Sequence, residues 1–233
     1  MQRINIKKYG KIYRIIGFKS NIDDPKQPHF YLKEDKKENK NKLKNNLIRA
    51  KSRVMELALC NDWQYFCTLT IDEKKQDRFD LQEFKKDLGV WIGNYNKKFG
   101  TQLKYILIPE YHKDGAAHLH GLLNNVSADS LQKNENNYLD LPYYKNRFGY
   151  LSLSKIKSPE RVSRYITKYI TKQFENGEKH KHLFLASHGL KSAELIHSGF
   201  CSSDYEFQYE NDFCKLSLLS PEDFEKFKVN ILS

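Results

Sequence analysis

The sequence lacks the short glycine-rich motifs that bind nucleotide phosphates. Neither GxxxxGK[ST] nor GxGxxG occurs in the chain, which excludes the usual phosphate-binding loops of ATPases and dinucleotide enzymes. The four cysteines show no CxxC spacing, so neither a zinc knuckle nor a redox pair is indicated. We interpret them as reduced thiols that lie mostly in the core.

Long hydrophobic runs are also missing. No window approaches the roughly 18 consecutive apolar residues of a membrane-spanning helix, and the N-terminal stretch MQRINIKKYGKIYRIIGF lacks the apolar segment of a secretory signal. The sequence also contains no long basic amphipathic helix with a bulky apolar face, the feature by which a protein binds a membrane surface. We therefore expect a soluble cytoplasmic protein that makes no membrane contact.

Acidic residues are in the minority. Forty Lys and Arg residues against twenty-nine Asp and Glu residues give a formal net charge of +11, and the basic residues are spread along the chain. Such an excess favours a polyanionic partner. The aromatic content of 13% adds rings on which the bases of single-stranded nucleic acid could stack.

Strand and helix patterns alternate through the middle of the chain. The strands 104–111 and 117–125 are joined by HKDGAA, whose Lys-Asp-Gly is a hairpin turn signal. A tight central hairpin predicts a largely antiparallel sheet, hence an α+β fold, and we expect it around a single core. Further strands are expected at 63–72 and 147–156, and helices at 77–100 and 158–177.

The two ends of the chain have weaker patterns. Residues 3–17 alternate around Gly10-Lys11 and predict a β-hairpin, and residues 32–59 show partial helical periodicity. Strands are expected at 181–190 and 205–219, and a short helix at 220–229. We divide the chain into an accessory hairpin and helix, 1–60, and a main domain with a C-terminal extension, 61–233.

The stretch AAHLHGLL, residues 116–123, places two histidines on one face of a strand. Side chains alternate along a strand, so His118 and His120 point the same way. Antiparallel pairing with 104–111 brings Glu110 alongside as a third ligand, and His112 shares that parity and could substitute for it. These ligand types suit Mg²⁺, Mn²⁺, Fe²⁺ or Zn²⁺. The alternative is a pair of structural histidines that hydrogen-bond to the backbone.

The stretch SRYITKYITK, residues 163–172, repeats the pattern YxxK on a predicted helix. A turn of about 100° per residue places four side chains within roughly 100° of arc: Tyr165, Lys168, Tyr169 and Lys172. The alternative is an amphipathic helix whose tyrosines cover the edge of the core and whose lysines reach solvent.

Tyrosine is useful in phosphodiester chemistry because it can attack phosphorus and hold the bond energy as an ester. Because the reference pKa of tyrosine is about 10, only ~0.1% of the side chain is phenolate at pH 7. Forming the reactive phenolate therefore carries a free-energy deficit of ~4 kcal/mol. A nearby ammonium group and a bound cation could offset that deficit.

Taken together, these motifs resemble a known family. FCTLT (66–70), Glu110 with HLHG (118–121), and YITKYITK (165–172) are similar, in order and spacing, to the three motifs of the HUH endonucleases, specifically the rolling-circle replication initiators of bacterial phages and plasmids. The resemblance runs from about Asn61 to Leu190. It implies a five-stranded antiparallel sheet with surrounding helices, RRM-like or ferredoxin-like, within the main domain 61–233.

The resemblance also implies roles for particular residues. His118, His120 and Glu110 would bind the metal, expected to be Mn²⁺ or Mg²⁺. Tyr165 or Tyr169 would attack the origin strand, leaving a 5′-phosphotyrosine and a free 3′-OH. The supporting cations would be Lys168 and Lys172.

The resemblance also implies binding partners. Single-stranded DNA at a replication origin, expected as a hairpin, would be the substrate, inside a bacterial host cell. A host helicase and polymerase would act with the protein, because the chain lacks a motor of its own.

Three other functions remain open at this point. A transposase or relaxase would use the same chemistry, and motif content discriminates poorly between them. A non-catalytic origin-binding module would explain the charge and the aromatic residues. An iron oxygenase with two histidines and one carboxylate would use the same ligand types, but it gives no role to the tyrosines.

Overall fold

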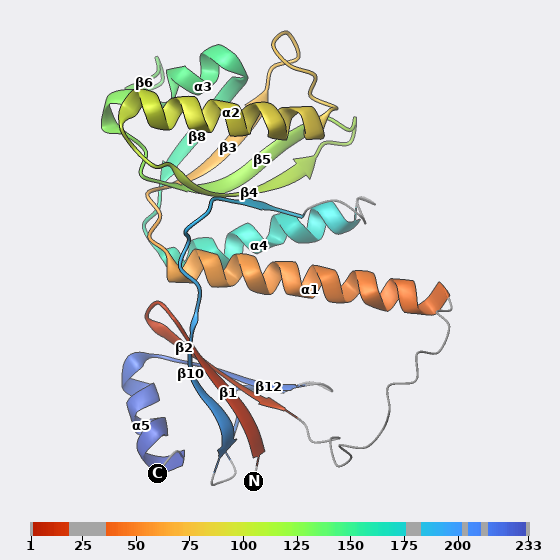
Figure 1. Cartoon of the computed structure of the whole chain (residues 1–233), viewed down its shortest axis with the longest axis vertical. Helices are drawn as coiled ribbons and strands as arrows, with labels where there is room; N and C mark the ends of the chain where they lie inside the picture. The colour runs from red at the N-terminus through yellow and green to blue at the C-terminus, as the bar shows by residue number, and fades with distance from the viewer. Residues whose placement is uncertain (1, 19–35, 176–182, 202–204, 211–213, 232–233) are drawn as a thin grey trace. The chain divides into compact units, whose positions relative to one another are not determined.

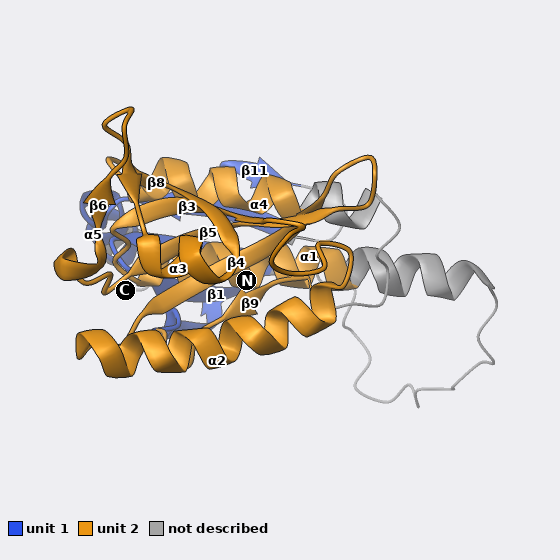
Figure 2. Cartoon of the chain, turned by 90° about the horizontal axis from the view of Figure 1, so that it is seen from above, with its two compact units in different colours: residues 1–36, 191–233 blue, residues 37–190 orange. Residues whose placement is uncertain are grey.

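A computed structural model describes residues 2–18, 36–175, 183–201, 205–210 and 214–231. The chain divides into two compact units, residues 37–190 and residues 1–36 with 191–233 (Figure 2). The predicted α+β class is confirmed, because each unit combines an antiparallel sheet with at least one helix. The expectation of a single core was wrong, since each unit has its own.

An antiparallel five-stranded sheet forms the centre of the larger unit. Its strand order is β8-β3-β5-β4-β9. The strands are β3 (Tyr65–Ile71), β4 (Lys104–Tyr111), β5 (Ala117–Asn124), β8 (Gly149–Lys155) and β9 (Leu185–Ala186). Four of them lie where the sequence predicts strands. The fifth is much shorter than the expected strand 181–190, whose first two residues lie outside the described ranges.

Helix α2 (Leu81–Phe99) covers one face of this sheet (Figure 1). The Asp80 side chain accepts hydrogen bonds from two backbone N–H groups in the first turn, and Gly100 ends the helix in the left-handed conformation at φ 60°. The stripe of Phe84, Leu88 and Trp91 is buried in the core on this face. The predicted C-terminal end of the helix 77–100 is therefore confirmed.

Helices α1 (Lys36–Cys60) and α4 (Pro159–Glu175) lie on the opposite face of the sheet (Figure 1). Ile166 and Ile170 of α4 are fully buried against the sheet, in a cluster that includes Ile106 and Ile108 of β4. The tyrosines of α4 therefore belong to the same side of the sheet as this isoleucine cluster.

The polar segment between β5 and β8 forms several short elements. It contains a single 3₁₀ turn (Ala128–Ser130), β6 (Gln132–Lys133), β7 (Leu139–Asp140) and α3 (Pro142–Arg147). The sequence predicts only an insertion here, because elements of two to six residues are too short to show a periodic pattern. Tyr144 and Phe148 nevertheless anchor the segment in the core.

The second unit contains another five-stranded antiparallel sheet, of order β10-β1-β2-β12-β11. Its elements are β1 (Gln2–Tyr9), β2 (Ile12–Phe18), β10 (Glu194–Cys201), β11 (Tyr209–Glu210), β12 (Cys214–Leu219) and α5 (Pro221–Ile231). The predicted hairpin 3–17 and the C-terminal helix are present.

The division of the chain at residue 60 does not coincide with these units. The hairpin β1–β2 pairs with β10 and β12 from the C-terminal part of the chain, whereas α1 packs within the larger unit. Among the residues that the structure describes, no helix is both long and apolar enough to cross a membrane.

Candidate metal and tyrosine site

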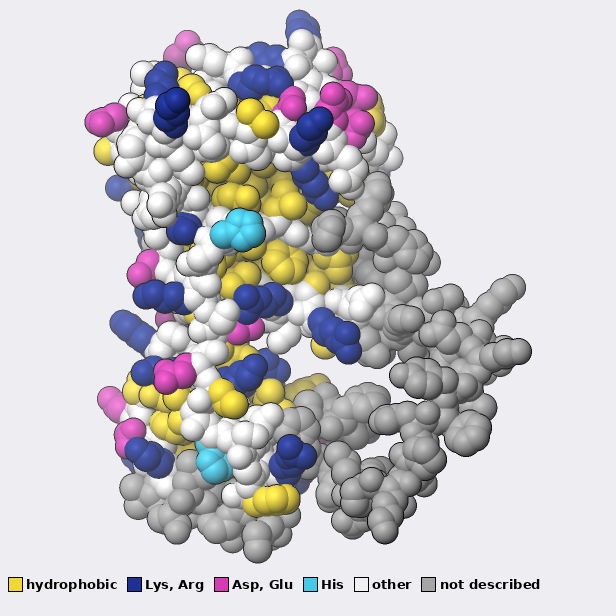
Figure 3. All heavy atoms as spheres, viewed as in Figure 1, with side chains coloured by type: hydrophobic (Ala, Val, Ile, Leu, Met, Phe, Trp, Pro, Cys, Tyr) yellow, Lys and Arg dark blue, Asp and Glu magenta, His cyan; other side chains and the backbone are white. Residues whose placement is uncertain are grey.

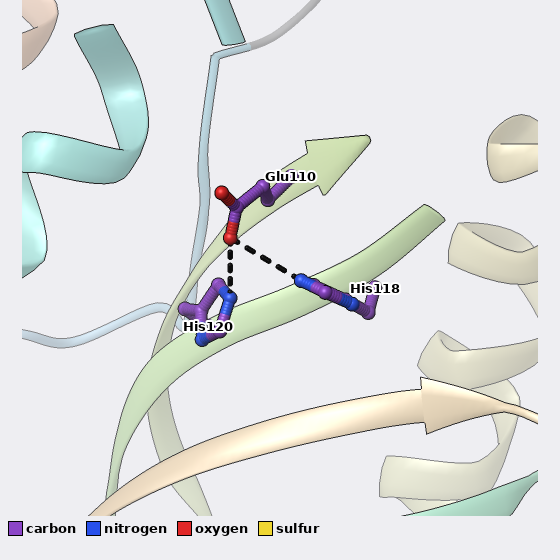
Figure 4. Close-up of side chains that lie close together, drawn as sticks. All are labelled: Glu110, His118 and His120. Atoms are coloured by element: carbon purple, nitrogen blue, oxygen red, sulfur yellow. Dashed lines mark hydrogen bonds and ion pairs between the residues drawn. The ribbon is translucent and has the colours of Figure 1, made fainter. Parts of the chain in front are cut away.

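Pairing between β4 and β5 brings three candidate metal ligands together. Glu110 lies directly opposite His118, and His120 follows two residues later on the same face. The Nε2 atoms of His118 and His120 lie 3.2 Å and 2.6 Å from the same carboxylate oxygen, Oε2 of Glu110 (Figure 4). The ligand atoms of the three residues all lie within 4.8 Å of one another, so this cluster could bind a metal ion.

The arrangement of these side chains fits a divalent metal. Both imidazoles turn Nε2 toward one point, and the two rings stand edge to face with their centres 4.7 Å apart. The side chains of Glu110, His118 and His120 are only 16%, 13% and 11% exposed. Two imidazole nitrogens and one carboxylate oxygen are ligands that several divalent metals accept, so the geometry does not name the ion.

Thr68 of β3 contacts the outer nitrogen of one histidine. Its Oγ1 lies 3.1 Å from Nδ1 of His120, directly across the strand pair. A partner on the second ring nitrogen orients a metal-binding histidine and fixes its tautomer. Sequence reasoning missed this residue, although the alternation in FCTLT places Thr68 on one face with Phe66 and Thr70.

His112 lies beside the cluster but is not part of it. Its ring stands edge-on to that of His118, with the centres 4.2 Å apart, and the side chain is exposed. The ligand atoms that converge within the described part of the chain come from Glu110, His118 and His120. The structure thus favours Glu110 over His112 as the third ligand.

Helix α4 places both tyrosines next to this cluster. The ring of Tyr169 stacks on that of His120, with a centre-to-centre distance of 3.8 Å and an angle of 19°. The Tyr169 hydroxyl donates a hydrogen bond of 2.7 Å to the Tyr165 hydroxyl. Phe66 of β3 packs edge-on against Tyr165 at 5.4 Å. One tyrosine therefore touches a candidate ligand, and the other is joined to it through its hydroxyl.

The two tyrosines differ in their surroundings. Tyr165 is 45% exposed, whereas Tyr169 is only 7% exposed. Burial raises the pKa of Tyr169 well above its ordinary value, and the Tyr165 hydroxyl and the Glu110 carboxylate raise it further. Tyr169 therefore holds its proton more firmly than a free tyrosine does, and Tyr165 is the more accessible of the two phenols.

The two lysines of the repeat are described to different degrees. Lys168 Nζ lies 5.6 Å from the centre of the Tyr165 ring, within the range of a cation–π contact. Lys172 lies in α4, but its side chain is outside the described residues. The structure therefore brings Lys168 to the tyrosines, and the role of Lys172 stays a prediction.

Comparison with known proteins gives a family match over this part of the chain. The family model described as Replication-associated protein ORF2 matches residues 64–174, a segment that contains Glu110, both histidines and the two tyrosines. No curated protein and no solved structure matches the chain.

Proposed function

We propose that this chain is a metal-dependent endonuclease that nicks and rejoins one DNA strand at a replication origin, because residues 64–174 match the model of the ORF2 family of replication-associated proteins. The reaction starts rolling-circle replication. The observation that carries the proposal is the stacking of Tyr169 on His120, because a tyrosine pair then lies beside three candidate metal ligands.

The proposal assigns a separate task to each group. Glu110, His118 and His120 hold the metal, for which Mn²⁺ and Mg²⁺ are the candidates. When bound, a divalent ion neutralises charge on the non-bridging phosphate oxygens and orients the scissile bond. Thr68 keeps the His120 ring in position through Nδ1.

Tyr165 is the first nucleophile in this account because it is the more exposed phenol. Its oxygen forms a bond to phosphorus while the bond from phosphorus to the 3′ oxygen breaks. The products are a 5′-phosphotyrosine and a strand end that takes up a proton to become a free 3′-OH. Lys168, next to the Tyr165 ring, stabilises the developing negative charge.

Tyr169 allows a second round of the same chemistry. Its hydroxyl already donates a hydrogen bond to the Tyr165 hydroxyl. After Tyr165 has reacted, the Tyr169 hydroxyl would act as the second nucleophile. Joining reverses the first reaction, because a 3′-OH attacks the phosphotyrosine and releases the phenol. Alternating use of two tyrosines on one helix would let the protein cut a newly made origin before it releases the old strand.

The expected partners follow from the same assignment. The substrate is single-stranded DNA at an origin, presented as a hairpin, of a phage or plasmid in the cytoplasm of a bacterial host. A host helicase and polymerase would supply unwinding and synthesis, because the sequence contains no phosphate-binding loop. A relaxase or transposase would use the same groups on a different DNA site.

Covalent attachment to DNA tests the proposal. Labelled single-stranded origin DNA incubated with Mn²⁺ or Mg²⁺ should give a denaturant-resistant protein–DNA adduct. Tyr165→Phe and Tyr169→Phe should each weaken cleavage or joining, and the double variant should form no adduct. Tyr209→Phe, at an exposed tyrosine in the other unit, is the matched control.

Two results would overturn the proposal. A fully active double variant would remove the tyrosines from the chemistry. Tight binding of origin DNA with no adduct at any metal concentration would instead identify a non-catalytic origin-binding module.

A further inference from the structure

The sheet face that carries the metal ligands extends onto β3 and the edge strand β8. Thr70 of β3 pairs with His118 on one side and with Tyr150 of β8 on the other, so these residues form one row across three strands. Strands in a sheet lie about 4.8 Å apart, which places Tyr150 roughly 10 Å from His118. The Tyr150 side chain is 62% exposed. An exposed aromatic ring therefore lies roughly 10 Å from the candidate metal ligands, on the same face.

A polar pocket lies beside Tyr150, where the insertion between β5 and β8 folds against the edge strand. Its volume is about 600 Å³, within the usual range for ligand pockets. Apart from Tyr150, its lining is mostly polar and includes four carboxamides, from Gln132, Asn134, Asn136 and Asn146. Carboxamides carry both a donor and an acceptor, which is the combination that recognises the edge of a nucleobase.

The loop that carries these amides is locally fixed. The Asn134 side-chain oxygen accepts hydrogen bonds from the backbone N–H groups of Asn136 and Tyr138, each 3.0 Å long. Asn137 adopts the left-handed conformation, with φ 63°, that closes the turn between β6 and β7. Asn134 therefore uses its side-chain oxygen to hold the turn, and the carboxamides assigned to a base are those of Gln132, Asn136 and Asn146.

The charges around the pocket favour a neutral group inside it. Two cations, Lys133 and Lys145, are matched by two carboxylates, Glu135 and Asp140. Lys145 and Asp140 form an ion pair at 3.6 Å. A pocket with balanced charge gives no net attraction to a phosphate, whereas its amides can pair with an uncharged base.

We propose that this pocket recognises one nucleobase of the DNA strand that is cut, with the base stacked on Tyr150 and its edge read by the carboxamides. Single-stranded nucleic acids are commonly bound by stacking of splayed bases on aromatic rings together with hydrogen bonds to base edges. The inference rests on the proposed function, because that function brings the strand to the metal ligands. It assigns sequence specificity to the β6–β7 hairpin and α3, outside the motifs that carry the chemistry.

Selection from random single-stranded oligonucleotides tests the inference. The full chain and its variants would be incubated with the pool, and the bound DNA would be sequenced. Tyr150→Ala should weaken binding by about 5- to 150-fold, the loss that matches one stacked base, and Tyr150→Phe should restore it. Asn136→Ala or Asn146→Ala should relax the preference at a single base position. Tyr209→Ala, at an exposed tyrosine in the other unit, is the matched control.

The outcomes separate this inference from the proposed function. The inference would be overturned if Tyr150→Ala bound and cut DNA like the unchanged chain, with the same base preference. Adduct formation would still support the proposed nuclease in that case. Loss of metal affinity in Tyr150→Ala would also overturn it, because the residue would then act on the metal site. If the unchanged chain formed no covalent DNA adduct, the proposed nuclease function would be overturned. The base preference of the bound DNA would still test whether the pocket recognises a nucleobase.

Discussion

Glu110 is the residue on which the candidate metal site depends, since both imidazoles converge on one of its oxygens. The hairpin turn between 111 and 117 is short, so the register that puts Glu110 opposite His118 could be predicted from the sequence. The contact of Thr68 with His120 could not be predicted from the sequence, because it depends on the pairing of β3 with β5, more than fifty residues later in the chain.

Removing one imidazole should abolish metal binding without unfolding the protein. We expect His120→Ala to lose Mn²⁺ binding in calorimetry, because only two of the three ligands remain, while its circular dichroism stays that of the unchanged chain. His112→Ala is the control and should bind Mn²⁺ normally, since His112 lies beside the ligand cluster and outside it. Equal affinity in the two variants would contradict the assigned ligand set.

Thr68 should tune the affinity of the site. Thr68→Val keeps the shape of the side chain but loses the oxygen that contacts Nδ1 of His120. Loss of such a partner typically weakens metal binding by about 10- to 100-fold, and titration with Mn²⁺ would measure it. Thr70→Val, at the next position of β3 on the same face, is the matched control. A similar loss in both variants would point to a general effect on the strand.

At the scale of elements, strand β5 needs a glycine directly after its second histidine. A Cβ atom added to Gly121 would clash with both the backbone oxygen of Ile106 and Cδ2 of Leu107. Because backbone cannot yield as a flexible side chain can, β4 and β5 must move apart. The glycine of HLHG therefore allows the close approach of the two strands that carry the candidate ligands.

Gly121→Ala should destabilise the protein and disturb the metal site together. Overpacking of this kind costs about 1–3 kcal/mol, which urea denaturation would measure, and Mn²⁺ affinity should decrease as β4 and β5 separate. Gly93→Ala is the control, because a Cβ there meets nothing within 4 Å on the surface of α2. That change should stabilise the helix by about 0.5–1 kcal/mol. A Gly121→Ala protein of unchanged stability would refute the packing argument.

Periodicity predicted the long elements and failed on the short ones. Helices α2 and α4 each have apolar residues at helical spacing along one face, so their existence and their buried faces could be predicted. The place of Tyr150 beside the pocket could not be predicted, because it depends on the non-local pairing of β8 with β3. The elements β6, β7 and α3 that shape its pocket are too short for any pattern.

At the scale of the whole molecule, the sequence did not reveal the second sheet as a separate unit. Its strands β1 and β2 lie at one end of the chain, and β10 and β12 at the other. No local pattern reports a pairing across nearly two hundred residues, so the two ends looked like separate appendages. The distribution of charge, in contrast, could be predicted. Figure 3 shows Lys and Arg side chains spread over both units on the face in view.

This spread of charge predicts strong dependence of DNA binding on salt. The chain carries a net charge of +11, and each phosphate contact releases counterions, so the logarithm of affinity should fall linearly with the logarithm of salt concentration. A complex with about four phosphate contacts would lose roughly 50-fold in affinity between about 50 and 200 mM salt. Fluorescence anisotropy with a single-stranded oligonucleotide would measure the slope. A flat profile would contradict binding along the DNA backbone.

The central claim is that a tyrosine of α4 attacks a phosphate positioned by Glu110, His118 and His120. Mass spectrometry of the trapped protein–DNA conjugate tests it most directly. Trypsin is unsuitable, because both tyrosines would lie in identical YITK peptides, but a protease that cuts after glutamate releases residues 161–175 in one piece. Fragmentation of that peptide should place the nucleotide on Tyr165, and on Tyr169 in Tyr165→Phe. A nucleotide attached to any residue outside α4 would contradict the account.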